Sequence, residues 1–224
     1  MSASAQPTPH PLGYEALARY RGNTLLRNPE VLFQYAERKQ RIAELELACV
    51  AHALEAGAPL AENASLFMNI HPAALSDGMR LRELIVREAE RLDIRLEHIV
   101  LEITEQGSIP DTPAVFRAIA DMRAVGLRFA LDDVGIAYSH LPFIDRIQPS
   151  FLKISQHFGT SFETDPTKTK IVGNLQSLAR DFGCELILEG IEHRATAEAT
   201  AAMGIKYGQG FLFGHPAEVR QLLS

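Results

Sequence analysis

Apolar residues along the chain follow two alternating patterns, one helical and one short and continuous. Within residues 111–126, Val115, Ile119, Met122 and Val125 fall on one face of a helix, and the apolar run LRFAL follows at once. Further helical segments are predicted at about 30–56, 77–92, 169–183 and 193–204, each of them leading into a short apolar run or strand-like segment. The repeat predicts helices that alternate with strands, which places the chain in the α/β class.

The short runs, such as IVLEI, LRFAL, FLKI and ELIL, are apolar almost throughout. This is typical of strands that are buried on both faces of a parallel sheet. Runs near residues 14, 66, 99, 127, 151, 185 and 206 predict seven or so strands, with no linker that would separate domains. We therefore expect one domain over residues 1–224, folded as a single TIM-like (β/α)8 barrel, for which ~200 to 250 residues is usual. An open doubly wound sheet would need a glycine-rich phosphate loop after its first strand, and none is present.

Polar side chains stand at the carboxyl end of most of these strands. They are Asn69, Glu102, Asp132 with Asp133, Lys153, Glu189 and Gln209. In a parallel barrel these ends meet at one rim. Carboxylates crowded there would repel one another unless cations compensate them, and a set of oxygen ligands selects hard ions such as Mg²⁺ or Mn²⁺. The neighbours Asp132 and Asp133 suit a site with two metal ions.

Two-metal sites of this kind typically clamp a displacement at phosphorus. The residue types alone therefore predict hydrolysis of a phosphodiester or a phosphomonoester. Lys153 could hold or deprotonate the attacking water, or it could simply pair with the acids around it. The eight histidines show no HExxH spacing, so zinc is not predicted.

Charge and composition exclude several other classes of protein. The formal net charge is −6, which argues against binding of long nucleic acid through a broad basic surface. No apolar run approaches the ~20 residues of a membrane span, and the first residues do not resemble a signal peptide. We expect a cytoplasmic protein without membrane insertion. Cys49 and Cys184 lie in apolar periodic segments, as buried free thiols commonly do.

Seven short motifs, found in order between about residues 6 and 216, also carry a family resemblance. They are EAL at 15–17 with Arg19, then Asn69, LEITE at 101–105, DDVG at 132–135, LKI at 152–154, EGIE at 189–192 and GQGFLFGHP at 208–216. In this combination the chain resembles the EAL family of bacterial cyclic-di-GMP phosphodiesterases. The resemblance implies a barrel whose first strand runs antiparallel to the others, and metal-dependent opening of cyclic-di-GMP to linear pGpG.

The resemblance also implies a role for individual residues. The first metal ion would be held by Glu15, Asn69, Glu102 and Asp132, and the second by Asp132, Asp133 and Glu189. Lys153 would contact the nucleophilic water, with Gln209 near it, while Arg19 and Leu17 would contact the substrate. Glu105 would hold the loop after the two aspartates, which in the family links metal binding to dimerisation. The implied ions are two Mg²⁺ or Mn²⁺, with Ca²⁺ inhibitory, and the implied partners are a second copy and fused or separate sensor or cyclase domains.

Several positions depart from the family pattern. Where the family loop usually reads DDFGTGYSSL, this chain has DDVGIAYSHL, so Val134, Ile136, Ala137 and His140 differ. Ala137 in place of glycine removes a position that takes positive φ without strain. Ser155 replaces the usual aspartate after Lys-Ile. These changes leave two alternatives open: a catalytically silent cyclic-di-GMP receptor or protein-binding module on the same barrel, and a metal-dependent phosphatase with another substrate.

Overall fold

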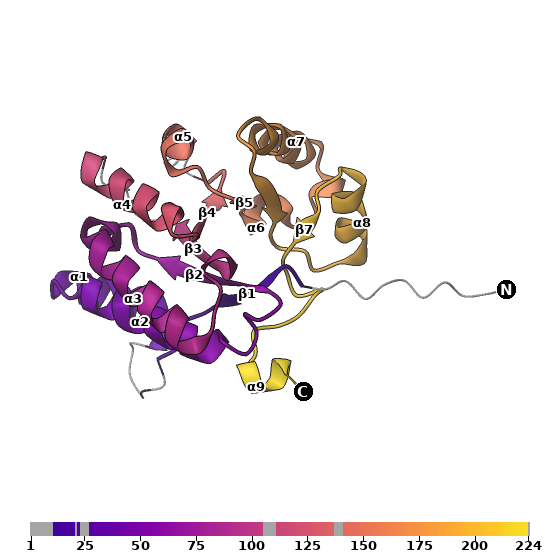
Figure 1. Cartoon of the computed structure of the whole chain (residues 1–224). Coiled ribbons are helices and arrows are strands. Elements are labelled where there is room, and N and C mark those ends of the chain that lie inside the picture. Colours follow the sequence, from indigo (N-terminus) through magenta and orange to yellow (C-terminus); the bar gives the residue numbers. More distant parts are fainter. Residues whose placement is uncertain (1–10, 21, 23–26, 105–110, 137–140, 224) are drawn as a thin grey trace.

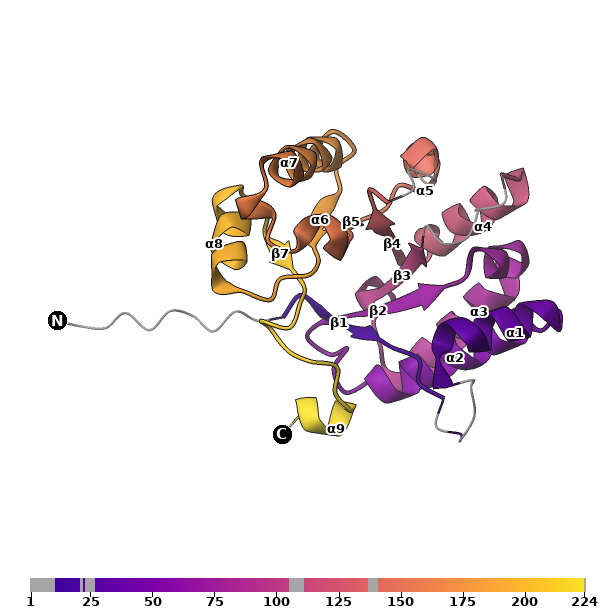
Figure 2. The same ribbon diagram turned by 180° about the vertical axis from the view of Figure 1, so that it is seen from behind.

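The computed structural model describes residues 11–20, 22, 27–104, 111–136 and 141–223. Seven parallel strands in these ranges form one curled sheet in chain order, with helices on its outer side (Figures 1 and 2). The strands are β1 (Gly13–Ala16), β2 (Ser65–Ile70), β3 (Ile99–Thr104), β4 (Arg128–Val134), β5 (Phe151–Ile154), β6 (Glu185–Leu188) and β7 (Tyr207–Gly208). The prediction of an α/β fold with helical crossovers and a parallel sheet is confirmed.

Two details of the predicted barrel are wrong. The described residues give seven strands where eight were expected, and β1 runs parallel to β2, with Glu15 opposite Phe67, where an antiparallel first strand was implied. The orientation follows from the connection, because the helices between β1 and β2 return the chain to the same end of the sheet, as parallel pairing requires. Among the described residues, β1 and β7 are the two edges of the sheet.

Helices account for most of the connections between strands. The longer ones are α1 (Pro29–Arg38), α2 (Ile42–Gly57), α3 (Gly78–Leu92), α4 (Pro113–Ala124), α7 (Pro166–Asp181) and α8 (Arg194–Ala202). The shorter ones are η2 (Pro72–Asp77), η3 (Leu96–His98), η4 (Leu141–Phe143), α5 (Ile144–Ile147), α6 (Gln156–Gly159) and η5 (Phe162–Thr164), and a further short helix, α9 (Val219–Leu222), follows the last strand. None of the helices in the described ranges is long and apolar enough to cross a membrane.

The single long helix predicted for residues 30–56 is divided into α1 and α2. Gln40 has φ 55°, a left-handed conformation that a right-handed helix cannot contain. The chain therefore turns between Arg38 and Ile42. Because both α1 and α2 contain apolar residues, the sequence pattern indicated one continuous helix. The other four predicted helices are found within a few residues of their expected ends.

The core has two parts, as the two faces of the curled sheet require. A large cluster fills the space between the sheet and the helices, and it includes Leu101, Leu131 and Leu188. A smaller cluster lies on the other face of the strands and consists of Phe67, Val100, Ala130, Phe151 and Ile187, with Leu12 and Tyr207 packed against it. Both cysteines are free thiols, as predicted; Cys184 is buried, whereas Cys49 is only half-buried.

Gly13 provides a test of how closely β1 packs on β2. A Cβ atom at this position would lie 2.3 Å from the Ser65 carbonyl oxygen and 2.7 Å from a ring carbon of Phe67. We expect Gly13→Ala to lower the free energy of unfolding by about 1–3 kcal/mol, because one of the two contacts is with backbone that cannot rotate away. Denaturant unfolding measures the change. Gly214→Ala is the control, since no atom lies within 4 Å of its added methyl group, and an equal loss in both variants would contradict the packing.

Candidate functional site

Apart from Asp133, the polar residues predicted at the strand ends share one face of the sheet with the smaller apolar cluster. Successive side chains of a strand point to opposite faces, so residues two apart lie on the same face. Each site residue follows a residue of the smaller cluster, or one packed against it, by two positions: Asn69 after Phe67, Glu102 after Val100, Asp132 after Ala130, Lys153 after Phe151, Glu189 after Ile187, and Gln209 after Tyr207. The apolar layer thus supports a polar layer at the carboxyl ends of the strands.

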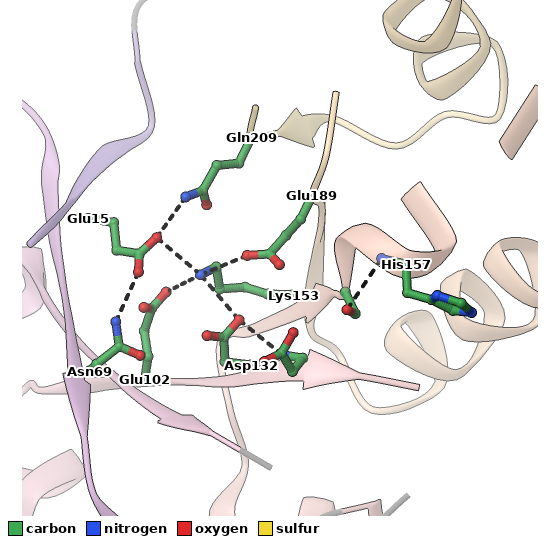
Figure 3. Close-up of polar contacts among 10 residues, drawn as sticks. Glu15, Asn69, Glu102, Asp132, Lys153, His157, Glu189 and Gln209 are labelled. Atoms are coloured by element: carbon green, nitrogen blue, oxygen red, sulfur yellow. Dashed lines mark hydrogen bonds and ion pairs between the residues drawn. The ribbon is translucent and has the colours of Figure 1, made fainter. Parts of the chain in front are cut away.

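Lys153 lies in the middle of the polar layer, and four carboxylates surround its ammonium group (Figure 3). Its Nζ atom is 2.8 Å from Glu102 Oε1, 3.0 Å from Glu189 Oε1, 3.2 Å from Asp132 Oδ1 and 3.6 Å from Glu15 Oε2. The Lys153 side chain is 1% exposed. One buried cation therefore binds acids on β1, β3 and β4 and the acid that directly follows β6.

Glu15 joins the two edge strands at this layer. Its Oε1 accepts a hydrogen bond from Asn69 Nδ2 at 2.9 Å, and its Oε2 accepts one from Gln209 Nε2 at 2.7 Å (Figure 3). No backbone pairing links β1 to β7 among the described residues. The Gln209 hydrogen bond consequently connects the last strand to the first across this gap.

A bulge in β4 explains how two consecutive aspartates reach the end of one strand. Leu131 pairs with Leu152 and Val134 with Ile154, so β4 contains one residue more than β5 over the same length. Asp133 occupies the extra position with φ 55°, a conformation that costs a non-glycine residue energy. Its N–H donates to Asp132 Oδ1 at 3.0 Å. Bulges of this kind are common beside functional sites, where they redirect side chains.

Burial and mutual repulsion leave the acids with unequal proton affinities. Burial raises the pKa of Glu102 to about 8 and that of Glu189 to about 7, although Lys153 opposes both changes. The pKa of Asp132 is raised for the same reason. For Glu15, burial acts upward, but Lys153, Gln209 and Asn69 together hold its pKa below the usual value. The four acids in turn raise the pKa of Lys153 despite its burial, so the lysine remains charged at neutral pH.

The structure brings together seven of the predicted site residues and separates others from them. Arg19 is exposed and donates to the neighbouring Ala18 carbonyl at 2.8 Å, while Leu17 is 41% exposed just beyond Glu15. Asp133 is adjacent to Asp132 but takes no part in the described ion pairs of Lys153. Glu105, Ala137 and His140 lie outside the described residues.

The donor groups of this layer suit a hard cation. In the described part of the chain, the ion-pair partners of Lys153 are carboxylates, and amide side chains bind one of these acids, Glu15. Both oxygens of the fully buried Glu102 lack a hydrogen-bond donor apart from the Lys153 ammonium. Oxygen ligands of this type match Mg²⁺ or Mn²⁺. The acids converge on Lys153, however, and within the described ranges no three acid, histidine or cysteine side chains are grouped closely enough to hold an ion on their own.

Ser155 is a neighbour of the site whose structural role was not predicted from the sequence. It is 1% exposed, and its Oγ accepts the His157 N–H at 3.4 Å, which caps the short helix α6. A serine two residues before the capped N–H is an ordinary helix-start signal. It was overlooked because α6 has only four residues and no apolar period.

Comparison with known proteins agrees with this geometry. The family model described as EAL domain matches residues 5–216. A cyclic di-GMP phosphodiesterase of Pseudomonas aeruginosa, PA2567, is 30% identical over 223 residues, which is 96% of this chain and 37% of the relative. The cyclic di-GMP phosphodiesterase PdeL of Escherichia coli is 33% identical over 127 residues, which is 56% of this chain and 35% of the relative. The chain thus spans little more than a third of either relative.

Solved structures extend the likeness to the fold. The EAL enzyme Bd1971, in a form with cAMP and cyclic-di-GMP bound, superimposes with a TM-score of 0.84 at 25% identity, over 95% of this chain and 59% of the other. The PaMucR phosphodiesterase in complex with c-di-GMP gives a TM-score of 0.81 at 24% identity, over 94% of this chain and 87% of the other. Because the PaMucR structure is only 24% identical to this chain, its likeness supports the fold alone.

Proposed function

Because this chain belongs to the EAL domain family, whose curated relatives are named cyclic di-GMP phosphodiesterases, we propose that it hydrolyses cyclic-di-GMP to linear pGpG with Mg²⁺ or Mn²⁺. The observation that carries the proposal is the cluster of four carboxylates around the buried Lys153 at the carboxyl ends of the strands. Burying four carboxylates around one lysine is energetically costly, and a stable fold does not require it. A site that binds cations and a phosphodiester would explain why the acids are gathered here.

Each residue of the site has a proposed part in the reaction. Glu15, Asn69, Glu102 and Asp132 would hold one ion, and Asp132, Asp133 and Glu189 a second; bound ions would supply charge neutralisation at the phosphate and a more acidic water. Lys153, being charged, orients that water by donating to it and stabilises negative charge at the reacting phosphate. Gln209 fixes Glu15 and lies beside it. Arg19 and Leu17 stand at the exposed border, where they would contact the substrate, and Glu105 would support the loop after Asp133.

The proposed activity is tested by incubating the purified chain with cyclic-di-GMP and Mn²⁺ and separating the nucleotides by chromatography. We expect pGpG to accumulate, and chelation with EDTA to stop its formation. Absence of product at high protein concentration, with Mn²⁺ binding demonstrated, would refute the hydrolase. Product from an unrelated phosphodiester, without competition by cyclic-di-GMP, would instead support a phosphatase of other specificity.

A catalytically silent receptor remains a second candidate because of one observation. Asp133, a proposed ligand of the second ion, is held at φ 55° and takes no part in the described Lys153 ion pairs. If that ligand does not reach an ion, the nucleotide would bind without being opened. Calorimetry in Ca²⁺ and turnover in Mn²⁺ separate the two candidates: binding in Ca²⁺ without hydrolysis in Mn²⁺ favours the receptor.

The context of the site is proposed on the same basis. Residues 1–224 would act as one EAL-type domain, with its motifs between about residues 6 and 216. The chain spans little more than a third of the relatives compared, so no regulatory mechanism of those proteins is proposed for it. A second copy of the chain and a sensor or cyclase domain are the proposed partners. Long nucleic acid is not a proposed partner, in view of the net charge of −6, and a cytoplasmic location stays a prediction from the sequence.

A further inference from the structure

Glu46 is a buried acid on α2 that lies outside the Lys153 cluster. Together with Val50, Leu54 and Gly57 it forms the buried face of the helix, and it is 1% exposed. Burial raises the pKa of Glu46 to about 7, and no cation of the described residues acts against this change. An apolar side chain would occupy the same face at lower energetic cost. A polar group kept at such a place needs a reason other than stability.

The contact made by Glu46 is with the end of β2. Its Oε1 accepts the backbone N–H of His71 at 2.9 Å, while its Oε2 is buried without a hydrogen-bond partner. His71 directly follows β2, and its Nδ1 accepts the Ala73 N–H at 3.2 Å, which caps η2. Glu46 therefore fixes the point at which the chain leaves the strand.

This point lies two residues beyond Asn69. Asn69 pairs with Glu102 across the sheet and donates to Glu15 Oε1 at 2.9 Å, so its side chain touches one acid of the site and its backbone lies beside another. A β-strand is stiff over two residues, and a displacement at His71 moves the Asn69 side chain with it. The backbone from Asn69 to His71 thus links the hydrogen bond between His71 and Glu46 to the polar layer.

We propose that Glu46 is a positioning residue for Asn69: by holding the His71 N–H from the neighbouring helix, it sets the Asn69 side chain against Glu15. The part of this inference that concerns activity rests on the proposed function. The part that concerns the position of Asn69 does not, because it depends only on contacts within the protein.

The experiment compares Glu46→Gln with Glu46→Leu. Glutamine keeps an acceptor for the His71 N–H, and leucine removes it while filling the apolar face. We expect Glu46→Gln to behave as the wild type. In Glu46→Leu the His71 amide should exchange faster, the side-chain amide signals of Asn69 should shift in NMR spectra, and the Kd for Mn²⁺ should rise about tenfold, as is usual when a partner of a metal ligand is lost. We also expect kcat to fall about tenfold with little change in KM.

Glu55→Leu is the matched control, since Glu55 is exposed on the same helix, and it should alter none of these readouts. Glu46→Asp withdraws the carboxyl by one methylene and serves as a second test if Glu46→Leu does not fold. Faster His71 exchange with unchanged Asn69 signals and unchanged Mn²⁺ affinity would overturn the proposal. Altered Asn69 signals in a protein whose wild type does not hydrolyse cyclic-di-GMP would support the positioning role and refute the hydrolase alone.

Discussion

Replacing Lys153 with methionine should lower the turnover of cyclic-di-GMP by about a thousandfold, the scale on which a preorganised donor stabilises developing negative charge. Methionine keeps much of the length and volume of the side chain but removes the charge that contacts four carboxylates. Nothing else among the described residues donates to Glu102 in this layer. Without the Lys153 ammonium group, the attacking water and the reacting phosphate would lose the hydrogen-bond donor that we propose for them. Steady-state kinetics with cyclic-di-GMP and Mn²⁺ measure the effect.

The Lys153→Met variant also separates catalysis from metal binding. Since the ammonium lies among the acids that would hold the ions, its removal should leave Mn²⁺ affinity equal to or higher than that of the wild type. Lys206→Met is the control, because Lys206 pairs with Glu185 at the other end of the sheet and is 63% exposed. Turnover of Lys153→Met within tenfold of the wild type would show that the lysine only balances the charge of the acids.

Loss of Lys153 has a further consequence for stability and its pH dependence. The pKa values of Glu102 and Glu189 are already raised with the lysine present, and without it they should rise further. A folded state whose acids have raised pKa values binds more protons than the unfolded state, so its stability falls as the pH increases. The free energy of unfolding of metal-free Lys153→Met should therefore be lower than that of the wild type, and the difference between the two proteins should be larger at pH 8 than at pH 6. At pH 8 we expect this difference to be roughly 3–5 kcal/mol.

Much of the site could be predicted because a parallel sheet obeys simple rules. Strand runs were recognisable from continuous apolar residues, and the polar residue at the end of each run had to reach the common rim. These two inferences needed only local sequence. The common face of Asn69, Glu102, Asp132, Lys153 and Glu189 is a finding of the structure, in which each of them follows a residue of the smaller apolar cluster by two positions.

What could not be predicted depends on contacts between distant segments or on single backbone angles. The bulge at Asp133 and the break at Gln40 each rest on one residue with positive φ that is not glycine. The orientation of β1 depends on its pairing with β2. Glu46 interrupts an apolar helix face, which was a usable signal, but only the His71 N–H explains it. Neither the amino-acid composition nor the periodicity of apolar residues contains information on such backbone angles and distant contacts.

Changing Glu102 to glutamine should weaken Mn²⁺ binding by at least tenfold. Glu102 is fully buried, both of its oxygens are free of donors other than Lys153, and it lies beside Asn69 across the sheet. The substitution keeps the shape of the side chain and removes one negative charge and one acceptor oxygen from the proposed first ion site. Loss of an outer partner of a metal ligand commonly costs about 10–100-fold in affinity, and loss of a ligand itself should cost no less.

Thermal or denaturant unfolding with and without Mn²⁺ measures this change without relying on turnover. At an ion concentration 100 times the wild-type Kd, binding stabilises the wild type by about 2.7 kcal/mol, whereas a tenfold weaker site gives about 1.4 kcal/mol. Glu97→Gln is the matched control: Glu97 lies just before the same strand, at its opposite end, and is 64% exposed. If Glu102→Gln kept the full stabilisation by Mn²⁺, the ions would bind away from this layer, and the carboxylates around Lys153 would need another explanation.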